Sequence, residues 1–431
     1  MNARKANNTK EKVRELQRKL YLAAKKSSKR KFHALHDKIY RKDVLLEAWK
    51  RVKANKGASG IDEISIGQIE QQGIEKFLGE IETELKDGKY NPKAVRRTYI
   101  PKGDKEKRPL GIPTVRDRVV QMATKIVIEP VFEADFLDCS YGFRPKKSAR
   151  EALERVRKDL NNRGWWVVEA DIKGYFDNID HEKLMLMVKQ RISDRKILKL
   201  INQWLKAGVM EGGVKTESEI GSPQGGVISP LLANIFLHYL DVKWDKHYKH
   251  LGKLVRYCDD FVVICKTKKD AEQTLKAIEF IMERLELTLH PTKTKMVNMW
   301  DGAEGFDFLG FHHRRKRTET STGRVFSETH QFPSKKAKTK MRENIRNVFS
   351  SRSMLLKSVE EMVKILNPKI VGMRNYYGLK NAKVQLNKID FYILKKCIIW
   401  FNYKTQKNQK HANYKVIRRK FAVAGLKTLV A

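Results

Sequence analysis

The chain has 431 residues, which at roughly 150 residues per domain suggests two or three domains, and 41% of them are hydrophobic, too many for a disordered protein. Lys and Arg number 90 against 50 Asp and Glu, so the net charge is +40 at pH 7 and the expected partners are polyanions. Four cysteines without a CxxC pair argue against a zinc ribbon or a disulfide framework, and no apolar run is long enough to span a membrane.

Basic residues are concentrated at the two ends of the chain. Residues 1–42 and 312–431 carry a large excess of Lys and Arg, whereas residues 43–311 are nearly neutral. Solvated lysine is the plain alternative, but an excess of this size is typical of a phosphate-binding surface, and charge does not distinguish DNA from RNA. The first 42 residues have a helical period and contain Glu11 and Glu15, which disfavour a mitochondrial transit peptide. We expect them to form a nucleic-acid-binding arm.

Helices and strands are expected in a mixed order along the central segment. Residues 44–55 have a helical period that stops at Lys56 and Gly57, and residues 275–285 predict another helix with one buried face. Between them, residues 165–172 are β-branched and aromatic, and residues 254–265 indicate two short strands around an acidic pair. This order predicts an α+β fold.

Acidic residues stand at the ends of the predicted strands. Asp171 closes the first strand, and Asp259 with Asp260 separates the other two. Carboxylates crowded together disfavour mutual ionisation unless a cation lies between them, and their hard oxygens suit Mg²⁺. An acidic pair alone is common in turns, so these residues indicate a metal site only in combination with the neighbouring motifs.

Seven motifs follow one another between residues 107 and 311. They are KRPLGIPTVRDRVVQ (107–121), SYGFRP (140–145), VVEADIKGYFDNIDH (167–181), GSPQGGVISPLLANIFLHYLD (221–241), RYCDDFV (256–262), LELTLHPTKTK (285–295) and FDFLGF (306–311). In this order they resemble the polymerase blocks of the reverse transcriptases encoded by bacterial group II introns, also called maturases. The resemblance is continuous from about Asp43 to Lys410. It implies a right-hand polymerase, with fingers and an antiparallel palm sheet in residues 43–311 and a helical thumb, or domain X, in residues 312–431.

The resemblance implies the catalytic residues. Asp171, Asp259 and Asp260 match the palm carboxylates, and the backbone carbonyl of Ile172 is expected as a further ligand for two Mg²⁺ ions, or Mn²⁺. Tyr175 is expected under the sugar of the incoming nucleotide, where its bulk would exclude a 2′ hydroxyl. A tyrosine of the protein core is the alternative interpretation.

Other matching positions are expected to contact nucleotide, template or primer. The implied contacts to the deoxynucleoside triphosphate are Arg96, Lys102, Arg108, Gln224 and Lys293. The implied template and primer contacts are Arg144, for which packing is the alternative, and Leu309, Gly310 and Phe311.

Three further features depend on the same resemblance. Cys258 precedes the acidic pair where the family more often has alanine, which suggests a neutral packing substitution or a thiol open to oxidation. NPKIVGMRNYYGLKN (367–381) resembles a thumb motif whose Tyr376 and Tyr377, with Tyr403, suit stacking on RNA, whereas Trp400 is expected in the core. The sequence holds no DNA-binding segment or endonuclease after the thumb, so target cleavage is not expected.

The implied function is RNA-directed DNA synthesis by a group II intron protein. Expected partners are structured intron RNA, an RNA template with its DNA primer, and deoxynucleoside triphosphates, in a bacterial cytoplasm rather than an organelle or membrane. Residues 1–42 would then be an RNA-binding arm that helps splicing. A related reverse transcriptase used in defence, diversification or repair stays open, and a non-catalytic RNA-binding splicing cofactor is disfavoured by the intact carboxylates. The sequence does not distinguish a monomer from a homodimer.

Overall fold

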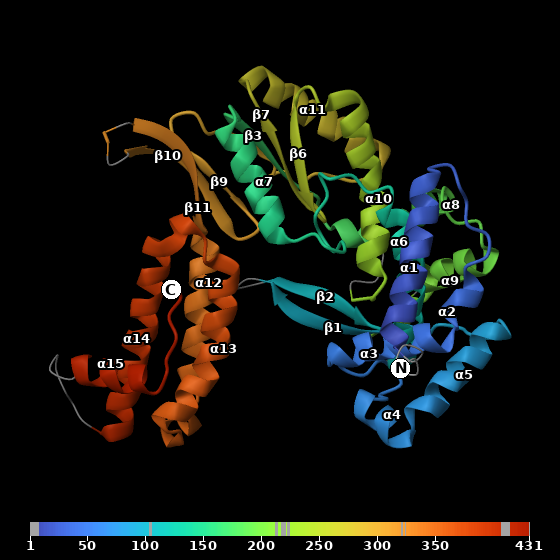
Figure 1. Cartoon of the computed structure of the whole chain (residues 1–431), viewed down its shortest axis with the longest axis horizontal. Helices are drawn as coiled ribbons and strands as arrows, with labels where there is room; N and C mark the ends of the chain where they lie inside the picture. The colour runs from blue at the N-terminus through green and yellow to red at the C-terminus, as the bar shows by residue number, and fades with distance from the viewer. Residues whose placement is uncertain are drawn as a thin grey trace, which may run out of the picture. The chain divides into compact units, whose positions relative to one another are not determined.

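The computed structural model describes residues 8–102, 106–211, 214–216, 221, 225–319, 322–323, 325–406 and 414–430. The chain divides into two compact units. Unit 1 comprises Met1–Ser148, Ala170–Phe261 and Gln273–Thr294, and unit 2 comprises Ala149–Glu169, Val262–Glu272 and Lys295–Ala431. Helices and sheets occur in both units, which confirms the α+β class (Figure 1).

Unit 1 begins with helices and a β-hairpin. Its elements up to residue 148 are α1 (Thr9–Lys26), α2 (His36–Ile39), α3 (Lys42–Ala54), α4 (Ile66–Gln72), α5 (Ile74–Lys86), β1 (Val95–Lys102), β2 (Glu106–Ile112) and α6 (Val115–Glu133). The expected helix at residues 44–55 is thus confirmed as α3. Thr114 caps α6 by accepting a hydrogen bond from the Asp117 N–H, and α6 is buried along most of its length against α1 and α3.

The N-terminal helix α1 is docked on the rest of unit 1. Its apolar residues Val13, Leu16, Leu20 and Ala24 are buried at helical spacing. The side chain of Gln17 donates a hydrogen bond to a carbonyl of α6, at 3.1 Å. The described part of this segment, residues 8–42, is therefore built into unit 1, and the outward face of α1 is exposed.

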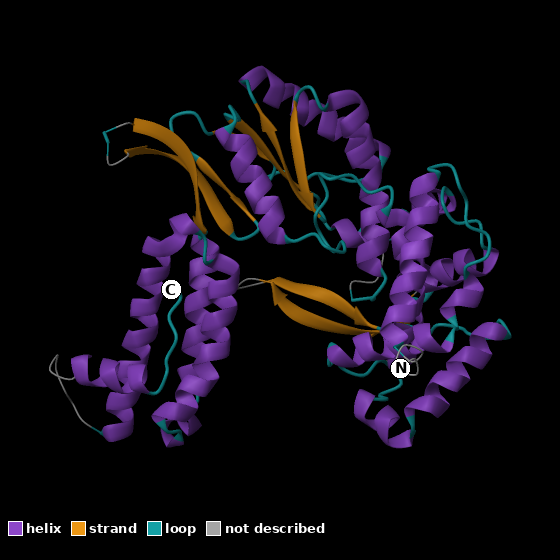
Figure 2. Ribbon diagram, viewed as in Figure 1, coloured by secondary structure: helices purple, strands orange, loops and turns teal. Residues whose placement is uncertain are grey.

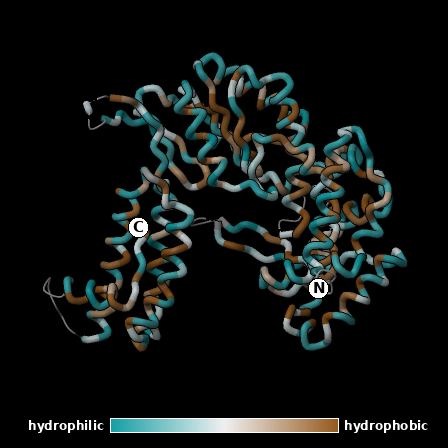
Figure 3. Tube along the Cα trace, viewed as in Figure 1, coloured by the Kyte–Doolittle hydropathy of each residue, from teal (hydrophilic) through white to brown (hydrophobic). Residues whose placement is uncertain are grey.

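The central segment contributes further helices and strands, which are α8 (His181–Lys189), α9 (Arg195–Lys206), β4 (Val209–Glu211), β5 (Val214–Thr216), α10 (Ser229–Lys243), β6 (Gly252–Tyr257), β7 (Asp260–Cys265) and α11 (Lys268–Arg284). Of these, β4 and β5 extend the β1–β2 hairpin to a sheet of order β2-β1-β4-β5. With β3 (Trp166–Asp171) and β8 (Lys295–Asn298), strands β6 and β7 form a sheet in the order β6-β7-β3-β8. The strands predicted around Asp171 and the acidic pair are confirmed, and Figure 3 shows them as apolar. Strands β3 and β7 each run from one unit into the other.

The rest of unit 2 joins a three-stranded sheet to a helical bundle. Its elements are α7 (Ala149–Asn161), β9 (Gly305–Phe308), β10 (Phe311–Glu319), β11 (Val325–Pro333), α12 (Lys335–Arg346), α13 (Val359–Tyr377), α14 (Lys383–Thr405) and α15 (Tyr414–Val423). The sheet has the order β11-β10-β9, and the segment after β11 contains helices (Figure 2). These helices bury their own apolar core, which includes Ile345, Leu366, Ile389 and Phe421. The expected helical C-terminal region is confirmed.

Among the described residues, none of the helices is both long enough and apolar enough to cross a membrane.

Candidate active site

The turn between β6 and β7 carries the acidic pair. Asp259 and Asp260 are half-buried in this turn. Burial raises the pKa of the Asp259 carboxyl, and the negative charge of Asp171 raises it further, whereas Cys258 and the Arg108 charge lower it. Asp171 and Asp259 are therefore close enough to repel each other, as the sequence predicted.

Cys258 is buried beside this pair. Burial raises the pKa of its thiol to about 12, and the thiol shares a hydrogen bond with Asp259. Oxidation proceeds through the thiolate, which such a pKa suppresses at neutral pH. This environment favours a packing role for Cys258.

Asp171 ends β3, where the chain pairs with the segment after α11. The backbone N–H of His290 donates to the carbonyl of Asp171 at 2.8 Å, and that of Lys173 donates to the carbonyl of Thr288 at 2.9 Å. Ile172, which is buried, forms the bridge with Leu289 between these two bonds. Neither bond uses the Ile172 carbonyl, so this oxygen suits the ligand role expected for it.

A lysine lies on the Asp171 carboxylate. The Nζ of Lys293 is 2.6 Å from Oδ2 of Asp171, with side chains that are 53% and 28% exposed. Lys293 thus supplies a positive charge to one of the three predicted catalytic carboxylates, and its expected contact with the nucleotide stays a prediction.

The residues present fit a divalent cation. The donors are hard carboxylate and carbonyl oxygens, one carboxylate has a raised pKa caused in part by its neighbour, and another is paired with an ammonium. Within the described ranges no three His, Cys, Asp or Glu side chains form a ready-made ligand shell. The assignment of a metal to these carboxylates therefore stays a prediction.

Tyr175 lies inside the protein. Its side chain is 2% exposed, and its hydroxyl donates to the carbonyl of Ala233 in α10 at 2.6 Å. Burial raises the pKa of this phenol well above its usual value. The ring supports the site from below in this conformation, and its role in sugar selection stays a prediction.

The hairpin of β1 and β2 presents two of the predicted triphosphate contacts. The register pairs Arg96 with Ile112 and Ile100 with Arg108, so Arg96 and Arg108 share one face. Lys102 is in β1, but its side chain lies outside the described part of the structure, as does all of Gln224. Gly225 packs so closely on β2 that a Cβ would collide with the carbonyl of Gly111, so this glycine lets its loop approach the hairpin backbone.

The expected template contact by Arg144 is corrected by its surroundings. The Arg144 side chain is only 4% exposed and forms an ion pair with Glu133 at 2.7 Å. It also donates to the carbonyls of Leu137, Ser140 and Phe136 at 2.5, 2.6 and 3.3 Å. A guanidinium with these partners braces its own loop, because contact with a template phosphate would require breaking a buried ion pair.

In unit 2, the predicted primer contacts form a turn held by helix α13. Leu309 and Gly310 have φ of 50° and 77°, and Phe311 is fully buried against the rings of Tyr376 and Tyr377. The Tyr376 hydroxyl donates to the Leu309 carbonyl at 3.0 Å. The two tyrosines therefore support this turn, and 42% of the Tyr376 side chain stays exposed for stacking. Tyr403 is 71% exposed and keeps the stacking role open, and Trp400 is buried as expected.

One charged residue near the acidic pair, Arg256, was not identified from the sequence. Arg256 precedes the acidic pair in β6 and is completely buried, where it forms an ion pair with Asp241. The signal was available, because an arginine in the apolar segment LVRYC needs a buried partner.

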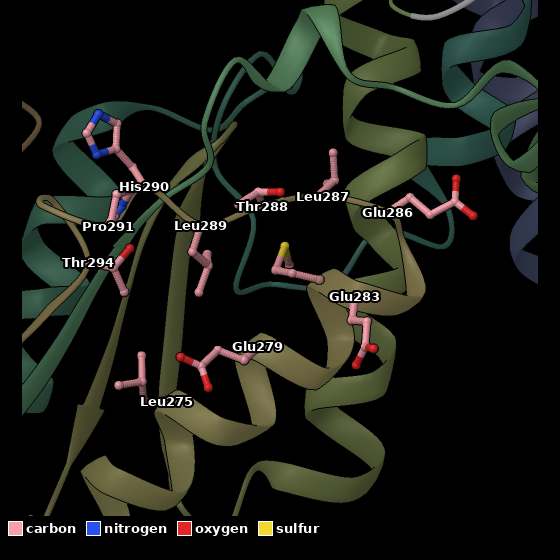
Figure 4. Close-up of a pocket in the computed structure, with 11 residues that line it drawn as sticks. Leu275, Glu279, Glu283, Glu286, Leu287, Thr288, Leu289, His290, Pro291 and Thr294 are labelled. Carbon is pink, nitrogen blue, oxygen red and sulfur yellow. The ribbon is translucent and has the colours of Figure 1, made fainter.

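A separate cavity lies between α11 and the segment that follows it. It has a volume of ≈ 710 Å³, and Glu279, Glu283 and Glu286 line it together with apolar side chains (Figure 4). Its carboxylates disfavour a triphosphate or an RNA backbone. The cavity is therefore no candidate for the nucleotide site.

Comparisons with known proteins agree with this geometry. Residues 100–313 match the family described as "Reverse transcriptase (RNA-dependent DNA polymerase)", and residues 338–421 match "Group II intron, maturase-specific domain". A solved structure, "Partial Cas6-RT-Cas1--Cas2 complex", is 22% identical, covers 58% of this chain and 42% of that chain, and has a TM-score of 0.36, too low to guide a comparison of sites.

Two relatives align over most of the chain. Group II intron-encoded protein LtrA of Lactococcus lactis subsp. cremoris is 31% identical over 450 residues, which cover 85% of this chain and 74% of that protein. Protein YkfC of Escherichia coli (strain K12) is 34% identical over 392 residues, which cover 82% of this chain and 99% of that protein. With a polymerase domain followed by a maturase-specific domain, the chain belongs to the group II intron-encoded reverse transcriptases and maturases and is an RNA-directed DNA polymerase.

Proposed function

We propose that the chain extends a DNA primer on an RNA template at a site formed by Asp171, Asp259 and Asp260. Divalent cations, Mg²⁺ or Mn²⁺, held by these carboxylates and the Ile172 carbonyl would activate the primer 3′ hydroxyl and stabilise the leaving pyrophosphate. The observation that carries this proposal is that β3, which ends at Asp171, lies beside β7, which begins at Asp260, in the same sheet. At the other end of the two strands the Trp165 N–H donates to the Cys265 carbonyl at 3.0 Å, so Asp171 and the acidic pair lie at the same edge.

Basic residues around the carboxylates would bind the nucleotide. Arg96 and Arg108 share a face of the β1–β2 hairpin, and the charge of Arg108 acts on Asp259. A triphosphate bound on this face would receive hydrogen bonds from their guanidinium groups. During the reaction the Lys293 ammonium would leave the Asp171 carboxylate and pair with the leaving pyrophosphate. By family resemblance, Lys102 and Gln224 would complete this nucleotide site.

The same chain would bind the structured intron RNA and assist its splicing. The outward face of α1 is lined by exposed cations, and the helices of unit 2 carry further ones. Their charges would attract phosphates, and the exposed ring of Tyr403 would stack on a base. The maturase-specific match at residues 338–421 supports this assignment.

The test measures DNA synthesis and splicing with the same preparation. Asp259→Asn and Asp171→Asn should abolish primer extension on an RNA template and leave RNA affinity unchanged. Asp245→Asn is the control, because Asp245 is an exposed residue of unit 1 that pairs only loosely with Lys249 at 3.9 Å. Extension by either catalytic variant at the wild-type rate would contradict the proposed site.

Splicing of the flanking RNA separates the alternatives. Stimulated splicing with extension supports the maturase, extension alone supports a reverse transcriptase that is independent of an intron, and splicing alone supports a non-catalytic cofactor.

A further inference from the structure

One arginine connects three segments around the acidic turn. Arg256 lies in β6, three residues before Asp259, and is completely buried. Its Nε and Nη2 donate to the two carboxylate oxygens of Asp241 in α10, at 2.7 and 2.5 Å. Asp241 is also completely buried, so this bidentate pair ties β6 to α10.

The third nitrogen of the same guanidinium reaches the turn itself. Nη1 of Arg256 donates to the carbonyl of Cys258 at 3.0 Å and to Oδ1 of Asn234 at 3.1 Å. The amide of Asn234 donates in turn to the carbonyl of Gly142 at 2.7 Å. Arg256 thereby joins the turn to helix α10 and to the SYGFRP segment.

The turn needs such support because its backbone is strained. Cys258 has φ of 62°, a left-handed conformation that costs energy in any residue with a Cβ. Gly142 packs against it so tightly that a Cβ there would lie 2.6 Å from the Cys258 nitrogen. The backbone N–H of Tyr141 also donates to the Arg256 carbonyl, at 2.9 Å. The direction in which Asp259 and Asp260 point therefore depends on contacts made by the residues just before them.

We propose that Arg256 is a positioning residue for DNA synthesis. The Arg256 guanidinium is fixed to Asp241 and also donates to the Cys258 carbonyl. Arg256 thereby orients the turn so that Asp259 and Asp260 face Asp171. This inference rests on the proposed function of the three carboxylates and adds the residue that aligns them.

The double substitution distinguishes positioning of the turn by Arg256 from simple stabilisation of the fold. Buried ion pairs contribute little net stability, and replacing both partners with apolar residues often preserves or increases it. If Arg256 only stabilises the fold, an apolar pair should restore activity together with stability. If Arg256 positions the turn, the apolar pair should restore stability alone, because it has no donor for the Cys258 carbonyl.

The experiment compares Arg256→Met, Arg256→Met/Asp241→Leu and Arg256→Lys with the wild-type chain. Arg191→Lys is the matched control, because Arg191 is also buried in unit 1, forms an ion pair with Asp135 at 3.0 Å and donates to the carbonyls of Ala24, Ser27 and Ser28. Single-turnover extension of a pre-annealed primer gives the rate constant of incorporation. Melting temperature and hydrogen exchange of the peptide 254–262 give global stability and mobility of the turn.

We expect Arg256→Lys and the double variant to lower the rate constant by about 100-fold, the cost of misplacing reacting groups by about 1 Å. Exchange at residues 257–260 should become faster in both, while RNA affinity stays unchanged. The double variant should melt at a higher temperature than Arg256→Met, and Arg191→Lys should keep the wild-type rate constant. Recovery of the rate constant in the double variant, or unchanged exchange in the turn, would overturn the inference. A wild-type rate in Asp259→Asn would overturn the proposed site as well, so the two failures are distinguishable.

Discussion

The ammonium nitrogen of Lys293 lies 2.6 Å from Oδ2 of Asp171, although the two residues are 122 positions apart. The pair brings the motif after α11 onto the end of β3. In the proposed site this lysine would compete with a divalent cation for Asp171 and would lie beside the reacting phosphates. Substituting this lysine should therefore affect metal binding and chemistry in opposite directions.

Lys293→Ala should strengthen Mn²⁺ binding by up to about fivefold, because an exposed ion pair is worth about 0.2–1 kcal/mol. It should also slow nucleotide incorporation by at least about 100-fold, the typical cost of removing one charge-stabilising group. Electron paramagnetic resonance measures Mn²⁺ affinity, and single-turnover extension measures chemistry. Lys295→Ala is the control, because Lys295 has the same 53% exposure and pairs with Glu169 at 3.5 Å. Parallel losses in both measurements would contradict this role.

The raised pKa of Asp259 predicts a stability cost that depends on pH. Its ionised form is disfavoured in the folded chain, so the cost is absent well below the unfolded value of 3.8, grows as pH rises from there to the raised folded pKa, and is constant above it. Without divalent cations, Asp259→Asn should raise the free energy of unfolding at pH 7 by about 0.5–2 kcal/mol and have no effect near pH 3. Thermal unfolding across this range checks the sign, and added Mg²⁺ should reduce the gain. A gain that does not change with pH would refute the explanation.

Two substitutions of Tyr175 distinguish a role in sugar selection from a role in packing alone. Tyr175→Phe removes the bond to Ala233 and should cost about 0.5–1.5 kcal/mol of stability, because the carbonyl lies inside α10 and loses only this additional donor. Since the ring remains, discrimination against ribonucleotides should persist. Tyr175→Val should relax this discrimination. Single-nucleotide incorporation with matched ribo- and deoxynucleotides measures the effect, and equal selectivity in the valine variant would assign Tyr175 to packing alone.

The Tyr376 hydroxyl should stabilise the primer turn by holding the Leu309 carbonyl. Tyr376→Phe keeps the ring against Phe311 but loses this hydrogen bond, at a cost of about 0.5–1.5 kcal/mol. We expect weaker primer-template affinity and shorter products, with a normal rate for the first nucleotide. Tyr403→Phe is the matched control, because this exposed tyrosine has a place on α14 away from that turn. A slower first incorporation with unchanged affinity would place Tyr376 in another role.

The docking of α1 changes how its role in RNA binding is tested. Deleting residues 1–42 would uncover the apolar surface that Val13, Leu16 and Leu20 cover, so weaker binding by that variant would be uninformative. Replacing the exposed residues Lys12, Arg14, Arg18 and Lys19 with Gln leaves that packing intact. The logarithmic dependence of RNA affinity on salt should then become shallower by about 0.7 for each single-strand phosphate that is no longer neutralised. An unchanged slope would mean that α1 only supports unit 1.

The sequence by itself predicted several helices and strands and the positions of three carboxylates at strand ends. Strand and helix periods are local, so β3, β6, β7 and α3 could be recognised from neighbouring residues, and Asp171, Asp259 and Asp260 stood at the strand ends. The motif order identified the polymerase family before any tertiary interaction was known. Local spacing was sufficient for these conclusions because each depends on residues that are close along the chain.

Tertiary structure decided which polar groups face the substrate and which hold the protein together. Arg144 was expected to meet a template, with packing as the alternative, and it pairs with Glu133. Tyr376 was expected to stack on RNA, and its hydroxyl also bonds to Leu309, 67 positions away. Arg256 stood within a recognised motif, and only its burial against Asp241 revealed a brace. A guanidinium or a phenol can equally well contact a substrate or stabilise the protein. Its partner is selected by the desolvation that folding imposes, which no local pattern records.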